Sequence, residues 1–216
     1  RTRIPDDQIR LSARAWERLL VLAHRDKRAA FREFADFYLA SANQIYWTDT
    51  HQLNLYLEDY HEALDEHLGV SIPCSEMITE LYVPRDRLVA FMAGVRGDFR
   101  EHGADLIYGT VRLVERDWGS FLPWAPEPWA CVIFILHVEH SPERIEPARA
   151  AFVRLIDHAM AHGGSYYLTY HRYARRDQLL KCYPEFPQFL RRKLDHDPQE
   201  LFSSDWYRHC KSLVGA

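Results

Sequence analysis

Titratable and hydroxyl-bearing side chains recur at every second position of several apolar segments. In the segment 105–115 they are Tyr108, Thr110 and Arg112. Side chains alternate between the two faces of a strand, so these three point the same way. The same spacing relates further pairs: Glu80 and Tyr82, His137 and Glu139, and Thr169 and His171. If these faces coincide, they form a wall of titratable groups over one sheet; the alternative is a solvated sheet face.

The string His137-Val138-Glu139-His140 places several potential metal ligands in close succession. Zinc-binding helices use histidines four positions apart, which converge on one metal ion. A strand instead sends His137 and His140 to opposite faces. We therefore expect no metal site here.

Other common catalytic and phosphate-binding patterns are missing from the sequence. It contains no GxSxG motif, and Cys74, Cys131 and Cys182 stand in contexts typical of packing. The turn 163–165 lacks the GxGxxG spacing that cradles a dinucleotide. The chain thus has no phosphate-binding loop of its own.

Composition narrows the classes of partner. The 216 residues are 47% hydrophobic and 27% charged, with a net charge of -4. No cluster of Lys and Arg concentrates positive charge, which argues against a nucleic-acid partner. The most apolar stretch, 130–138, is much shorter than the roughly 20 residues of a membrane-spanning helix. Four cysteines without a CxxC pair suggest reduced thiols and a cytoplasmic protein.

The first third of the chain is predicted to be helical. From Leu11 to Leu39, apolar residues recur every three or four positions, as in an amphipathic helix or a broken pair of helices. A second helical stretch, 49–68, ends at Gly69, which suits a left-handed helix cap. We expect residues 1–72 to form a helical segment packed on the sheet.

The remainder, 73–216, alternates strands and helices. Strands are predicted at 76–83, 105–115, 130–140 and 165–171, and helices at 84–102, from Ser141-Pro142 to Gly163, and around 178–183 and 187–194. These elements predict an α+β domain: an antiparallel or mixed sheet covered by helices.

The C-terminal part resembles the closing segment of known enzymes. The strings that carry the resemblance are 163–171 (GGSYYLTYH), 183–189 (YPEFPQF), 193–198 (KLDHDP) and Leu201-Phe202, preceded by 79–88 (TELYVPRDRL), 108–117 (YGTVRLVERD) and 130–140 (ACVIFILHVEH). In order and spacing they resemble FAD-linked oxidases of the vanillyl-alcohol-oxidase type, which include sugar-lactone and alditol oxidases and cytokinin dehydrogenases. The resemblance covers 75–209.

The resemblance implies a substrate domain that works with a preceding FAD-binding domain. Such enzymes oxidise an alcohol or amine carbon by hydride transfer to the flavin, and the protein supplies a proton acceptor and an oxygen-binding donor. By position, Arg112, His137 and His171 match the family's active-site arginine and histidines. The remaining expected contacts are substrate contacts from Tyr108, Thr110, Glu139, Tyr167, Tyr170 and Glu80, and flavin contacts from His171 and Tyr170.

Two departures from the family pattern concern the substrate. The acid two positions before the arginine in alditol oxidases is Thr110 here, and their lysine falls at Ala174. These departures argue against a polyol substrate. Glu80 or Glu139 is a candidate replacement for the acid, with a solvated or salt-bridged carboxylate as the alternative. A second hypothesis for the whole chain is a non-catalytic binding or interaction module with the same fold.

Overall fold

The computed structural model describes residues 3–5, 7–45, 60–70 and 72–215. They belong to two compact units, Arg1–Pro73 and Cys74–Ala216. The units divide beside the boundary expected from the sequence. Residues 49–59 of the second predicted helical stretch lie outside the described residues.

The first unit contains the helices α1 (Ala13–Arg25), α2 (Lys27–Ala40) and α3 (Tyr60–Leu68). Asp26 separates α1 from α2: its backbone leaves the helical conformation, and its side chain accepts a hydrogen bond from the Ala29 amide. An aspartate in this position is a favourable helix N-cap. The long apolar repeat of the sequence therefore forms two helices.

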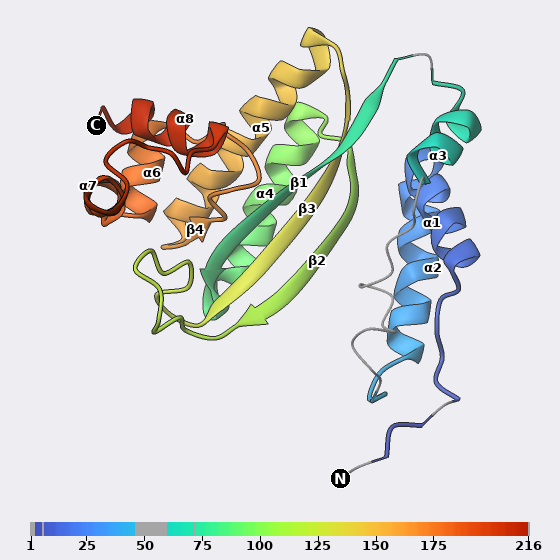
Figure 1. Cartoon of the computed structure of the whole chain (residues 1–216). Coiled ribbons are helices and arrows are strands. Elements are labelled where there is room, and N and C mark those ends of the chain that lie inside the picture. The colour runs from blue at the N-terminus through green and yellow to red at the C-terminus, as the bar shows by residue number, and fades with distance from the viewer. Residues whose placement is uncertain (1–2, 6, 46–59, 71, 216) are drawn as a thin grey trace. The chain divides into compact units, whose positions relative to one another are not determined.

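The second unit is built on a four-stranded sheet (Figure 1). Its strands are β1 (Cys74–Pro84), β2 (Leu106–Val114), β3 (Trp129–Glu139) and β4 (Ser165–Tyr166). Their order is β2-β3-β1-β4, and all neighbouring strands are antiparallel. The predicted α+β class is confirmed.

Helices cover one face of this sheet. They are α4 (Leu88–His102), α5 (Pro142–Ala161), α6 (Arg176–Cys182), α7 (Phe186–His196) and α8 (Asp205–Val214), with a short 3-10 turn at Arg85–Arg87. Figure 1 shows α4 and α5 running along the same side of the strands. Leu81, Val132 and Phe134 point to this side, where they join one buried apolar cluster with residues of the helices. The helices thus cover the sheet face that carries the odd-numbered residues of β1.

A buried ion pair fixes α5 against α4. The Asp98 side chain is 6% exposed and accepts hydrogen bonds from Arg154 Nε at 2.6 Å and Nη2 at 3.1 Å. His102 Nδ1 and His158 Nε2 lie 3.6 and 3.7 Å from Oδ2 of Asp98. Paired donors on one buried carboxylate satisfy its charge and restrict the geometry of the contact.

The fourth strand is shorter than expected. The sequence predicted a strand over 165–171, whereas β4 ends at Tyr166. After the Tyr167 amide donates to the Glu80 carbonyl at 2.9 Å, the chain turns. The following aromatic side chains then pack on different sides of the sheet instead of alternating along a strand. Their separate packing overrides the strand propensity of the segment.

Gly164 provides a test of the close approach between α5 and β1. A Cβ at this position would lie 1.9 Å from the Tyr82 carbonyl oxygen and 3.0 Å from that of Ala159. Gly164→Ala should therefore lower the free energy of unfolding by about 3 kcal/mol through backbone displacement. Urea unfolding followed by circular dichroism measures this change.

Gly97→Ala is the matched control, because nothing lies within 4 Å of a Cβ at that position in α4. It should stabilise the helix by about 0.5–1 kcal/mol. Equal stability of Gly164→Ala and the wild type would contradict the packing described for this turn.

Candidate functional site

The sheet face turned away from α4 and α5, here called the distal face, brings together most of the predicted polar residues. In the β1–β3 register, Glu76 is opposite His137, Glu80 opposite Ile133 and Tyr82 opposite Cys131. Residues directly opposite in an antiparallel pair share one face. On β2, Tyr108, Thr110 and Arg112 stand beside Ile135, Ile133 and Cys131. The polar residues of β1, β2 and β3 therefore share one face, as expected, whereas the fourth expected pair, Thr169 and His171, lies beyond the end of β4.

Glu80 is the centre of a hydrogen-bonded cluster on the distal face. Its side chain is 8% exposed. Oε1 accepts hydrogen bonds from the Tyr82 hydroxyl at 2.5 Å and from the Cys131 thiol at 3.2 Å. Oε2 accepts one from the Tyr170 hydroxyl at 3.3 Å. One carboxylate oxygen is thus anchored from the buried side, and the other is directed to Tyr170.

The donors of this cluster keep their protons over the usual pH range. Burial, together with the negative charge of Glu80, raises the pKa of the Tyr82 hydroxyl and of the Cys131 thiol far above their ordinary values. Burial and Glu80 also raise the pKa of Tyr170. Donors that stay protonated continue to hold the carboxylate in place.

Arg112 lies within electrostatic reach of the same cluster. Its side chain is exposed, and its neighbour across the strands is Cys131. The positive charge of Arg112 opposes the effect of burial and of Glu80 on the pKa values of Cys131 and Tyr170. Arg112 thus provides a positive charge near Cys131 and Tyr170, two of the donors to Glu80.

Tyr167 and Tyr170 extend the cluster from the loop after β4. Their ring centroids are 4.7 Å apart. Tyr167 packs against the buried group of Tyr82, Cys131 and Ile133, while the side chain of Tyr170 is 43% exposed. Tyr170 therefore connects the buried carboxylate with the surface of the unit.

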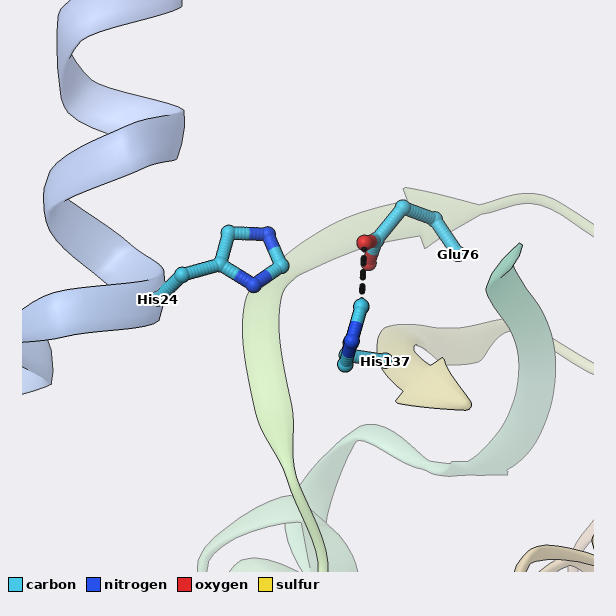
Figure 2. Close-up of side chains that lie close together, drawn as sticks. All are labelled: His24, Glu76 and His137. Carbon is cyan, nitrogen blue, oxygen red and sulfur yellow. Dashed lines mark hydrogen bonds and ion pairs between the residues drawn. The ribbon is translucent and has the colours of Figure 1, made fainter. Parts of the chain in front are cut away.

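A second pair occupies another end of the distal face. Figure 2 shows the Glu76 carboxylate facing the ring of His137. Glu76 Oε1 and His137 Nδ1 are 2.9 Å apart. A carboxylate at Nδ1 orients an imidazole and favours the tautomer with the proton on that nitrogen. Farther along the same face, Glu139 Oε2 is 3.6 Å from Arg144 Nε. His140, by contrast, contacts Ser75 at 2.7 Å.

The structure does not bring Arg112, His137 and His171 into one pocket. Arg112 is beside Cys131, and His137 lies six positions farther along β3 than Cys131, a span of roughly 20 Å. The His171 ring packs against Phe152 of α5 in a tilted arrangement, with ring centroids 4.5 Å apart, and stacks on Tyr173 at 5.2 Å. Phe152 belongs to the apolar cluster of Leu136 and Val138. His171 is therefore on the helix-covered side.

Sequence reasoning missed the roles of Tyr82 and Cys131 beside Glu80. The spacing of Glu80 and Tyr82 was visible, but Cys131 looked like a packing residue. The signal that would connect them is the β1–β3 register, in which Tyr82 and Cys131 are direct partners. That register is not readable from either strand alone.

Comparisons with known proteins add little to this geometry. No protein-family model matches the sequence, and no curated protein matches it. Among solved structures, the chain is similar to a C-terminal segment of the alpha subunit of aIF2 from Pyrococcus abyssi. The identity is 16% and the TM-score 0.25, over 72% of this chain and 91% of that one. A similarity this weak carries no argument.

Among the described residues, no helix is both long and apolar enough to cross a membrane.

The environment of His171 predicts a pH-dependent stability. Burial lowers the pKa of His171 from 6.5 to about 4. Between these values the unfolded chain binds a proton that the folded chain does not. The contribution of neutral His171 to the free energy of unfolding is therefore fully present above pH 6.5. The free energy of unfolding falls by about 3 kcal/mol as the pH is lowered from there toward 4.

His171→Phe keeps an aromatic ring between Phe152 and Tyr173 but removes the titration. Relative to the wild type, this variant should gain stability as the pH is lowered from neutral to about 4. Urea unfolding at a series of pH values measures the difference. The same replacement at exposed His140 should not reproduce the gain. A difference that stays constant with pH would contradict a buried, neutral His171.

Proposed function

We propose that the second unit is the substrate-side domain of a flavin-dependent oxidoreductase that oxidises a CH–OH group. The observation that carries this proposal is the Glu80 carboxylate, which is anchored at one oxygen and directed at the other toward half-exposed Tyr170. Alcohol oxidation needs a positioned proton acceptor and a cation that stabilises charge on the substrate oxygen, and a carboxylate with a nearby arginine can supply both. The resemblance of residues 75–209 to FAD-linked oxidases supports the same reading.

The residues around Glu80 fit the reactive edge of a flavin better than its phosphates. Tyr167 and Tyr170 offer aromatic surface, and Arg112 offers a positive charge. The described residues contain no glycine-rich phosphate loop, so another domain would hold most of the FAD. Tyr170 and Arg112 are the residues that would meet the flavin and the substrate. When bound, FAD accepts a hydride from the substrate carbon.

The chain's own residues then handle the proton and the oxygen. Glu80 accepts the proton of the substrate hydroxyl at Oε2, either directly or through the Tyr170 hydroxyl. Tyr82 and Cys131 hold the carboxylate in position through Oε1. Arg112 stabilises the negative charge that develops on the substrate oxygen. His171 has no part in this proposal, because its ring is packed against Phe152.

Glu80→Gln tests the proton acceptor. In the intact gene product that contains this chain, the variant should retain flavin but slow anaerobic flavin reduction by an alcohol about a hundredfold or more, since glutamine accepts no proton. Stopped-flow absorbance measures the rate. Glu101→Gln, an exposed change on α4, is the control and should reduce at the wild-type rate. An intact product that neither contains nor binds flavin would refute the proposed function.

Arg112→Ala tests the cation. Removing an oriented positive charge from the developing oxyanion should slow the same anaerobic reduction by about a hundredfold, or about 3 kcal/mol. Flavin content should remain at the wild-type level, as read from the visible absorption of the purified protein. Arg96→Ala, an exposed arginine of α4, serves as the matched control. Wild-type reduction by Arg112→Ala would remove this residue from the mechanism.

A further inference from the structure

An apolar row crosses the distal face next to the Glu80 cluster. Ile78 of β1, Ile135 of β3 and Tyr108 of β2 are side by side in the sheet register. The neighbouring row contains Glu80, Ile133 and Thr110. Alternate residues of a strand are roughly 7 Å apart, so the apolar row begins within one small molecule's length of Glu80.

The side chains of this row are partly accessible. Ile78, Ile135 and Tyr108 are all half-buried, whereas Ile133 in the next row is almost fully buried. Ile78 packs against the buried group of Tyr82, Cys131 and Ile133, which keeps it in place. Ile78 and Ile135 therefore present partly accessible hydrocarbon to a molecule that approaches the carboxylate from this side.

The apolar side chains of this row favour a substrate whose non-reacting carbon skeleton is itself apolar. A molecule that extends from Glu80 along this side of the face would place its next carbon atoms over Ile135 and Ile78. Hydrocarbon in that position is favoured because it removes apolar surface from water. Further hydroxyl groups would lose hydrogen bonds to water without gaining a partner from the isoleucines.

We propose that the substrate is an alcohol with an apolar body, cyclic or aliphatic, and that Ile78 and Ile135 are the residues that select it. This inference rests on the proposed function, since it takes Glu80 as the reacting end of the site. It differs from that function in naming the part of the substrate that does not react.

Methyl NMR of the 216-residue chain tests the inference without any flavin. The chain is labelled at its isoleucine methyl groups, and the Ile78 and Ile135 signals are assigned with Ile78→Val and Ile135→Val, which preserve β-branched packing. Benzyl alcohol and cyclohexylmethanol should shift both signals in a saturable way. Sorbitol at the same concentrations should leave both unchanged.

Ile135→Thr provides the selectivity test. Replacing the ethyl group of Ile135 by a hydroxyl should weaken cyclohexylmethanol binding about three- to tenfold. Val111→Thr is the control, because Val111 is a 46% exposed residue of β2 on the opposite sheet face. The affinity of the Val111→Thr variant for cyclohexylmethanol should equal that of the wild type. Methyl dispersion of each variant verifies that it is folded.

Three results would overturn the inference: sorbitol shifting the two signals as benzyl alcohol does, neither apolar alcohol shifting them, or Ile135→Thr binding as tightly as Val111→Thr. The outcome is separable from that of the proposed function. Apolar alcohols that bind to a protein without flavin would leave the ligand class intact and reject the oxidation. A flavoprotein whose Ile78 and Ile135 signals respond to sorbitol alone would leave the oxidation intact and reject the apolar ligand class.

Discussion

The antiparallel pairing of β1 with β3 is the constraint on which the second unit depends. It extends along the whole of both strands, from Cys74 opposite Glu139 to Pro84 opposite Trp129. A shift of one residue would exchange the two faces of either strand. Leu81 and Val83 would then leave the core beneath α4 and α5, and Glu80 would enter it. The register therefore fixes both the core and the site.

The same register explains why a nearly buried carboxylate is tolerated at Glu80. Burial of a charged group is unfavourable unless hydrogen bonds compensate for the lost water. Tyr82, two residues along β1, and Cys131, its partner on β3, supply two donors to one oxygen. Tyr170 reaches the second oxygen from outside the sheet. A carboxylate held in this way has a defined orientation, which a surface glutamate lacks.

Strand alternation predicted which side chains share the distal face, and this part of the site was accessible from the sequence. Tyr108, Thr110, Arg112 and Glu80 all point to it. How far along the sheet each of these side chains lies could not be predicted from the sequence, because it depends on the strand register. The β2–β3 register also includes an irregularity between Leu106 and Tyr108. That register separates Arg112 from His137. His171 was misplaced because its loop has no regular period, and its ring packs with Phe152.

Under the proposed function, substrate and flavin meet on the distal face around Glu80. A crystal structure of the intact gene product with an apolar alcohol soaked into it would reveal where the two molecules bind. We expect electron density for the alcohol between the Glu80 carboxylate and the flavin ring, with its hydroxyl within hydrogen-bond distance of Glu80 or Tyr170. A flavin ring bound elsewhere, with the distal face covered by protein, would contradict it.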